Sequence, residues 1–275
     1  MKIPDWLIYL VVLAAVLYGV FSRSTNTDAP PAPPVDIEGQ GSILPPPSVF
    51  DQEVMVEVDP STTASTGTAF SLGTTGYWLT ARHVVDGCTN LALAVGNRSV
   101  VPVRDYQVFA QGDLALLRTD GGPDSIEFDL ETDLHVGQYG FHFGYPQGQP
   151  GEVTSRLLSR SRLTTRGRYS TSEPVLAWAE SGRTRGLIGT LGGISGGPVY
   201  NVEGEVIGVT VAESPRRGRI YTTAPASVET FLTSLTQFQP EDGTKRAITL
   251  DNYGAEADRL RRNLTIIPVV CRERQ

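Results

Sequence analysis

Short runs of alternating apolar and polar residues dominate the chain between positions 49 and 239. Successive side chains of a strand point to opposite faces, so this period of two predicts half-buried β-strands. Clusters rich in glycine and proline separate the runs and predict turns. Regularly spaced short strands favour a pair of barrels or a sandwich over a sheet built from alternating strands and helices. The expected strands are 54–58, 68–72, 91–95, 100–108, 114–117, 139–143, 198–200, 206–211 and 220–223.

Helical periodicity is rare in this part of the chain. It occurs at 226–238, and it returns at 255–264, where an amphipathic helix precedes a short apolar strand at 265–270. The 35 residues after Pro240 are too few for an independent domain. We therefore predict that 49–240 forms the main domain and that the C-terminal extension, 241–275, packs on it as an appendage.

The N-terminal region has a different pattern. Residues 6–21 form an uncharged apolar run of 16 residues, which as a helix would reach about 24 Å, just short of a typical hydrocarbon core. We interpret 1–24 as an uncleaved transmembrane anchor, with a cleaved signal peptide as the alternative. Residues 25–48 are rich in proline and small polar residues, so they predict a disordered linker.

Composition adds limits on partners. The net charge of −7 and the pI of about 5.1 argue against a general affinity for nucleic acid. Arginines gather at 156–168 and 216–219, either as solvated strand faces or as a basic rim for an acidic partner. Cys88 and Cys271 either pair or remain as two buried thiols, and the sequence does not decide between these. Two cysteines without a nearby histidine do not make a structural zinc site, so no metal is expected.

The glycine-rich segment 192–198 contains the most informative serine, Ser195. A serine between glycines can occupy a tight turn in which its own N–H and that of Gly193 point together, as an oxyanion hole requires. The alternative is an ordinary glycine-rich turn. The segment also matches the nucleophile elbow of α/β-hydrolases, but that fold places its histidine after the serine. All the histidines here precede Ser195, which excludes the elbow.

A serine hydroxyl needs a base to remove its proton, and the base needs a carboxylate to fix its tautomer. His83 lies where an expected strand gives way to a short turn, whereas His135 and His142 lie in plain strand contexts and are read as structural or exposed. Asp113 stands at the start of another apolar strand. The chain order His83, Asp113, Ser195 is that of chymotrypsin-type enzymes and not of subtilisins.

These motifs resemble the trypsin-like serine proteases, and within them the HtrA (Deg) type, over roughly 66–238. The resemblance implies two six-stranded antiparallel β-barrels with the active site between them, polypeptide substrates bound as an extra strand, and no cofactor. It also implies an extracytoplasmic location, either as a single-pass protein of the cell inner membrane or, after cleavage of the N-terminal segment, as a free periplasmic or secreted protein. The matching segments are 67–72, 79–87, 112–117, 144–146, 195–198 and 204–209.

The chain also departs from the family pattern. The segment after Pro240 is shorter than a PDZ domain, so PDZ-gated activation is not carried over. Ile194 stands before the nucleophile, where family members often have asparagine. These departures leave an alternative of another class, a catalytically idle, membrane-tethered protein that binds peptides.

The resemblance also implies where substrate specificity is set. It places the floor of the substrate pocket six residues before the serine, at Gly189. Because no carboxylate is there to bind Arg or Lys, we expect a preference for small or medium apolar residues before the scissile bond. The expected pocket walls are Val209, Thr210, Val211 and Ala212.

Overall fold

The computed structural model describes residues 41–59, 65–96, 99–236, 238 and 241–272. All of them belong to the compact unit that begins at Glu38. The expected anchor at 1–24 and the linker up to residue 40 lie outside the described residues. In the described ranges, no helix has both the length and the apolar character that crossing a bilayer requires.

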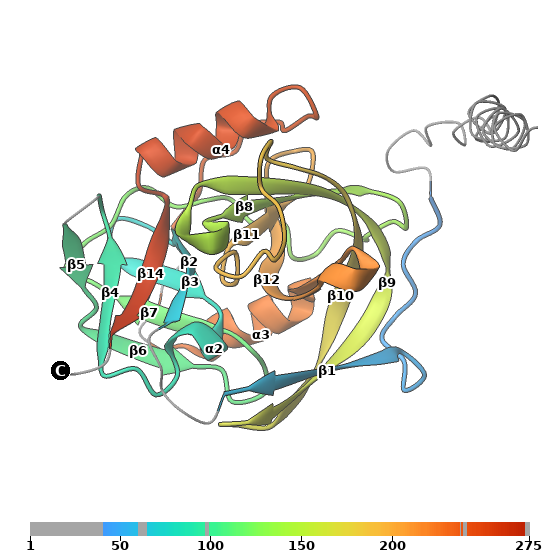
Figure 1. Cartoon of the computed structure of the whole chain (residues 1–275), viewed down its shortest axis with the longest axis horizontal. Coiled ribbons are helices and arrows are strands. Elements are labelled where there is room, and N and C mark those ends of the chain that lie inside the picture. The colour runs from blue at the N-terminus through green and yellow to red at the C-terminus, as the bar shows by residue number, and fades with distance from the viewer. Residues whose placement is uncertain (1–40, 60–64, 97–98, 237, 239–240, 273–275) are drawn as a thin grey trace, which may run out of the picture. The chain divides into compact units, whose positions relative to one another are not determined.

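Two antiparallel sheets, each curved into a barrel, form the body of the protein (Figure 1). In the C-terminal barrel the strand order is β9-β10-β13-β12-β11-β8, and β8 pairs in turn with β9 to close the ring. An additional strand, β1, lies parallel on the outer edge of β9. The strands are β1 (Gln52–Val58), β8 (Tyr139–Gly144), β9 (Gly151–Gly167), β10 (Thr171–Arg183), β11 (Pro198–Tyr200), β12 (Val206–Ser214) and β13 (Arg219–Thr223).

The N-terminal barrel has the strand order β5-β4-β14-β2-β3-β7-β6. Strands β5 and β6 are separated by residues 103 and 104, whose N–H groups continue the pairing to Leu91 and Arg118, so one bent strand closes the barrel. The expectation of two chymotrypsin-like β-barrels is therefore confirmed. The strands are β2 (Ser65–Ser71), β3 (Tyr77–Thr80), β4 (Asn90–Ala94), β5 (Val100–Pro102), β6 (Asp105–Val108), β7 (Ala115–Arg118) and β14 (Ile266–Arg272).

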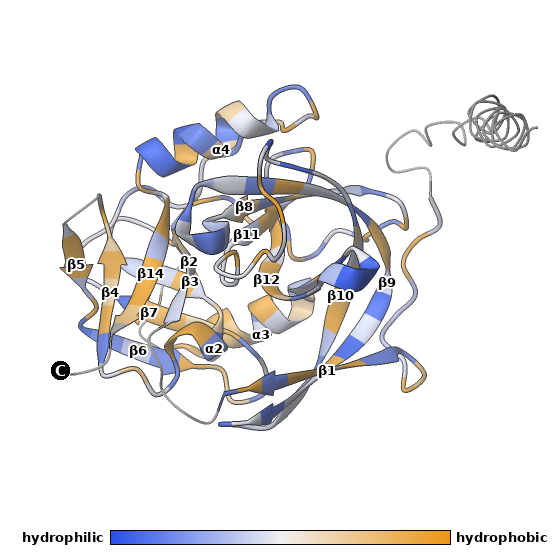
Figure 2. Ribbon diagram, in the orientation of Figure 1, coloured by the Kyte–Doolittle hydropathy of each residue, from blue (hydrophilic) through white to orange (hydrophobic). Residues whose placement is uncertain are grey.

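The C-terminal extension contributes to the N-terminal barrel itself. Its helix α4 (Tyr253–Arg262) leads into β14, which pairs with β2 on one side and with β4 on the other. The expectation of an appendage is wrong, because β14 is an interior strand of the sheet whose apolar residues are buried in two hydrophobic clusters that also contain residues of the C-terminal barrel. Figure 2 shows β14 as one of the apolar strands, whereas polar residues cover most of α4. Cys271 of β14 forms a disulfide with Cys88, which settles their pairing.

The helices of the body are short. They are α2 (Arg82–Val85), α3 (Pro225–Ser234) and two single turns, η1 (Pro146–Gly148) and η2 (Pro215–Arg217). The helix expected at 226–238 is thus present as α3 but ends earlier, because the chain turns at Leu235 into an extended conformation.

The two longest strands, β9 and β10, were not among the strands expected from the sequence. They form one antiparallel hairpin with shifts of register at Ala177 and Glu180. Two arginines of β9 are hydrogen-bonded to the main chain: Arg160 donates to the carbonyl of Pro45, and Arg162 donates to the carbonyl of Ser48. In this part of the molecule the basic residues therefore hold the segment that leads into β1.

Candidate functional site

His83 and Asp113 lie side by side in the N-terminal barrel. His83 belongs to α2, directly after β3, and Asp113 precedes β7, the neighbour of β3. The His83 Nδ1 atom lies 2.6 Å from Asp113 Oδ2, and the backbone N–H of His83 donates to Oδ1 at 2.8 Å. Two residues 30 positions apart therefore meet because the strands that carry them are paired.

The environments of the two side chains differ. The Asp113 side chain is 3% exposed, whereas that of His83 is 27% exposed and remains accessible from the surface. Burial alone would lower the pKa of His83, but the charge of Asp113 and the hydrogen bond to it outweigh burial, so the pKa is raised above its usual 6.5. Arg168 opposes this rise. The imidazolium form is thus stabilised by its carboxylate partner.

Ser195 lies in the loop between β10 and β11, and this loop is hydrogen-bonded to both barrels. Its carbonyl accepts the N–H of Thr68 in β2 at 2.8 Å, and the next residue, Gly196, donates to Thr210 in β12 at 2.8 Å. Gly196 has φ +87°, and a Cβ there would lie 2.1 Å from the carbonyl oxygen of Thr68. Only glycine fits at this position, which explains the Ser-Gly sequence.

The same loop lies close to the helix of His83. A Cβ built on Gly67 would lie 2.6 Å from the side chain of Val84 and 3.0 Å from the carbonyl oxygen of Ser195. A single glycine of β2 therefore separates the residue after His83 from the backbone of Ser195. The structure brings His83 and Asp113 into contact and places the Ser195 loop beside them.

Two backbone donors of the serine loop have no acceptor among the described residues. Gly192, Ile194 and Gly196 all donate within the protein, but the N–H groups of Gly193 and Ser195 do not. Gly193 has φ +101°, and its carbonyl is held by the hydroxyl of Thr68 at 2.8 Å. The Ile194 side chain is buried in an apolar cluster of the C-terminal barrel.

The residues expected to form the substrate pocket lie near this loop in different environments. Gly189 is exposed, with φ +82°, and its carbonyl accepts Arg183 Nη1 at 2.9 Å. Val209 and Val211 are fully buried in the apolar clusters. Thr210 is buried and bonded to the serine loop, and Ala212 is half-buried. Their role in a pocket stays a prediction.

Two side chains that the sequence reading missed also contact Asp113. The Tyr169 hydroxyl donates to Asp113 Oδ1 at 2.9 Å, and Glu173 Oε1 accepts the Asp113 N–H at 2.6 Å. The Glu173 side chain is buried, and its Oε2 atom has no hydrogen-bond partner among the described residues. Burial, reinforced by the charge of Asp113, raises the pKa of Glu173 to about 8. A signal for Glu173 was present, because it is in phase with the buried Val175 and Ala177 of β10.

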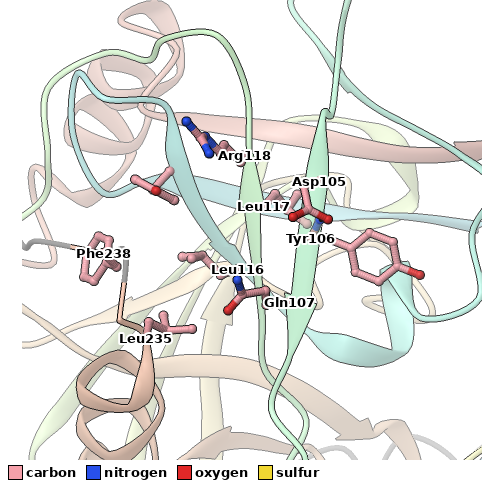
Figure 3. Close-up of a pocket in the computed structure, with 9 residues that line it drawn as sticks. Asp105, Tyr106, Gln107, Leu116, Leu117, Arg118, Leu235 and Phe238 are labelled. Atoms are coloured by element: carbon pink, nitrogen blue, oxygen red, sulfur yellow. The ribbon is translucent and has the colours of Figure 1, made fainter.

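The other histidines take part in structural contacts. His142 is completely buried, lies 2.7 Å from Ser155 Oγ through Nε2, and has its pKa lowered to about 3 by burial. His135 Nδ1 lies 2.9 Å from the carbonyl oxygen of Gly41. A hollow beside β6, β7 and the end of α3 contains no candidate catalytic residue (Figure 3). Within the described ranges no group of histidine, cysteine or acidic residues is arranged to hold a metal ion.

Part of this chain is similar in sequence to known proteins. The curated "Probable periplasmic serine endoprotease DegP-like" of Ectopseudomonas mendocina (strain ymp) is 27% identical over 155 residues, covering 56% of this chain and 31% of the relative. The protein of the same name from Hahella chejuensis (strain KCTC 2396) is 27% identical over 160 residues, covering 58% and 32%. The chain therefore spans about a third of the length of these relatives.

Solved structures show the same fold. The active form of the Rv3671c protease from M. tuberculosis matches with a TM-score of 0.51 and 19% identity, over 74% of this chain and 99% of that one. The inactive form matches with a TM-score of 0.51 and 19% identity, over 65% and 90%. The profile of the trypsin-like peptidase domain matches residues 67–209, which is more than half of the chain. The chain therefore belongs to the trypsin-like peptidase family and is homologous to its DegP-like, HtrA-type serine endoproteases.

Proposed function

We propose that this chain is a serine endopeptidase in which Ser195 is the nucleophile, His83 the general base and Asp113 the residue that orients the base. The observation that carries the proposal is the 2.6 Å contact between His83 Nδ1 and Asp113 Oδ2 beside the Ser195 loop. A buried carboxylate on Nδ1 holds the proton there and leaves Nε2 free to accept one.

The reaction follows from that tautomer. His83 Nε2 takes the Ser195 hydroxyl proton as the oxygen attacks the peptide carbonyl, and the new imidazolium then protonates the leaving amine. The N–H groups of Gly193 and Ser195, which have no acceptor in the described part of the chain, would bind the oxyanion of the tetrahedral intermediate. Water hydrolyses the acyl-enzyme by the same proton transfers in reverse order.

The substrate pocket is the second part of this proposal. We propose a pocket with Gly189 as its floor and with walls from Val209 to Ala212. None of these residues carries a carboxylate, which supports small or medium apolar residues before the scissile bond. The nearest acid in this strand, Glu213, is already bonded to the N–H of Leu191 at 2.8 Å. Cleavage of a peptide library dominated by sites after Arg or Lys would overturn this preference.

The experiment that tests the reaction is covalent labelling of the full chain by a fluorophosphonate. The wild type should be labelled, and Ser195→Ala should not be labelled and should lose about 10⁶-fold in turnover. Ser159→Ala, which removes an exposed hydroxyl from β9, is the matched control and should be labelled as the wild type is. A wild type that binds peptides but resists labelling would instead indicate a catalytically idle binding protein.

The proposed location is the extracytoplasmic side of the cell inner membrane, with 1–24 as anchor and 25–48 as linker. The relatives carry "periplasmic" in their names, and the Cys88–Cys271 disulfide fits an oxidising compartment. Fractionation of cells that express the full chain should find it in the membrane fraction and accessible to external protease in spheroplasts. Recovery in the cytosol would contradict this location.

A further inference from the structure

The hairpin of β9 and β10 belongs to the C-terminal barrel, but its turn lies against the helix that carries His83. Arg168, at the start of the turn, donates to the main-chain carbonyl of Asp86, directly after α2. The next residue, Tyr169, reaches Asp113. The turn at 168–170 therefore contacts the C-terminal end of α2 through Arg168 and the Asp113 carboxylate through Tyr169.

The Tyr169 side chain is held in place from its other side. The guanidinium carbon of Arg82 lies 3.9 Å from the centre of the Tyr169 ring. Arg82 is fixed in turn by Asp86, at 2.8 Å, and by the carbonyl oxygen of Phe109, at 3.2 Å. The hydroxyl at the end of this ring thus points at Asp113 from a fixed position. Burial raises the pKa of Tyr169, so the hydroxyl keeps its proton and remains a donor.

Glu173 supports the same aspartate from the backbone side. It is the third residue of β10, shortly after the turn, and its carboxyl group accepts the Asp113 N–H at 2.6 Å. A Cβ built on Gly112 would lie 2.4 Å from Glu173 Oε2, so the carboxyl group packs directly against the chain before Asp113. The hairpin therefore contacts Asp113 at two places: Tyr169 bonds to the Asp113 carboxylate, and Glu173 bonds to the Asp113 backbone N–H.

We propose that Tyr169 is a positioning residue for the peptidase reaction: its hydroxyl holds the Asp113 carboxylate in the orientation that faces His83, and Glu173 fixes the backbone of the same aspartate. This inference rests on the proposed function. It assigns to the C-terminal barrel a second contribution to the site besides the serine loop, made by residues 169 and 173 of one hairpin.

The pKa of His83 depends on the hydrogen bonds that the Asp113 carboxylate accepts. Asp113 Oδ2 faces His83 Nδ1, while Oδ1 accepts both the His83 N–H and the Tyr169 hydroxyl. Loss of the Tyr169 donor leaves more negative charge on the carboxylate, which stabilises the imidazolium and raises the pKa of His83. The other titratable or charged groups near the pair are Glu173 of β10, Arg82 and Asp86 at the ends of α2, and Arg168 of the turn.

The test is Tyr169→Phe in the full chain, which removes one oxygen and keeps the ring under Arg82. We expect kcat to fall about tenfold, the factor associated with a hydrogen bond to a charged group, with KM unchanged because Tyr169 does not contact substrate. The acid limb of the pH profile should move to higher pH. Tyr200→Phe removes another buried hydroxyl, one that has no hydrogen-bond partner within the described ranges, and should change neither kcat nor the acid limb of the pH profile.

A histidine titration by NMR, which needs no turnover, separates this inference from the proposed function. Tyr169→Phe should raise the pKa of His83 by several tenths of a unit or more, whether or not the protein is a peptidase. A His83 pKa equal in Tyr169→Phe and wild type would overturn the positioning role even if the wild type reacts with fluorophosphonate. Conversely, a shifted pKa in a protein that resists fluorophosphonate would refute the function and leave the contact established.

Discussion

Glu173 provides a test of the electrostatics of the site that does not depend on catalysis. Its buried carboxyl group accepts one hydrogen bond, from the Asp113 N–H, and its second oxygen has no partner in the described part of the chain. Burial and the neighbouring Asp113 charge raise its pKa from 4.5 to about 8. The folded protein therefore keeps a proton on Glu173 at neutral pH that the unfolded chain has already released.

This difference in proton binding makes the folded state less stable as pH rises. Between the unfolded pKa of 4.5 and the folded pKa of about 8, the native state binds one more proton than the unfolded state at this residue. Each pH unit inside that window then lowers the free energy of unfolding by about 1.4 kcal/mol. From pH 5.5 to pH 7 the loss amounts to about 2 kcal/mol, and a folded pKa one unit higher or lower leaves most of it in place.

Glu173→Gln removes this titration and keeps an oxygen that can accept the Asp113 N–H. We expect the variant to gain about 2 kcal/mol relative to the wild type between pH 5.5 and pH 7. Urea unfolding of both proteins at several pH values measures this gain, because the other titrating groups cancel in the difference. Glu229→Gln, on the exposed face of α3, controls for the loss of one negative charge.

One result would refute the reasoning. If the free energies of unfolding of Glu173→Gln and wild type differ by the same amount at pH 5.5 and pH 7, Glu173 does not hold a proton in the folded protein. A difference that moves in favour of the wild type as pH rises toward 4.5, and is constant above it, would mean that the group is ionised and stabilised in the fold.

Two further changes test the support of the site. Replacing both Cys88 and Cys271 by serine removes a cross-link between residues 183 positions apart. The free energy of unfolding should then fall by about 2–5 kcal/mol in urea titrations without reductant. An unchanged unfolding midpoint would show that the pairing is not maintained in solution. Gly196→Ala places a methyl group against the Thr68 carbonyl of β2, at a residue whose φ is positive. The variant should lose fluorophosphonate labelling while its circular dichroism stays native. Labelling at the wild-type rate would contradict the loop geometry.

The motifs that could be predicted from the sequence are those whose geometry is local. His83 follows β3 and Asp113 precedes β7, so each residue was recognisable from a strand boundary and a turn. The glycines around Ser195 likewise report a backbone conformation that only glycine tolerates, as the φ of +87° at Gly196 shows. Chain order then selected the chymotrypsin type, and the paired strands bring the first two residues together.

The hairpin of β9 and β10 was missed for a physical reason. Polar and charged residues alternate with small or apolar ones along β9, so the segment reads as basic and only weakly hydrophobic. Its stability comes from pairing on both edges, with β8 and β1 on one side and β10 on the other. Such long-range pairing leaves little trace in local periodicity. Tyr169 lies in the turn of this hairpin, where no neighbour in sequence indicates contact with Asp113.

The position of β14 could not be predicted either, and it bears on the helix that carries His83. A helix of four residues has too few internal hydrogen bonds to be stable alone, so α2 depends on tertiary contacts. Asp113 accepts the His83 N–H, Ser65 Oγ donates to the Val84 carbonyl at 2.8 Å, and Cys88, just beyond the helix, is bonded to Cys271. Because β14 pairs with both strands that flank this region, β2 and β4, the C-terminal segment is part of the framework that fixes the general base. A change that displaces β14 should therefore alter the site of His83 although it lies far from it in sequence.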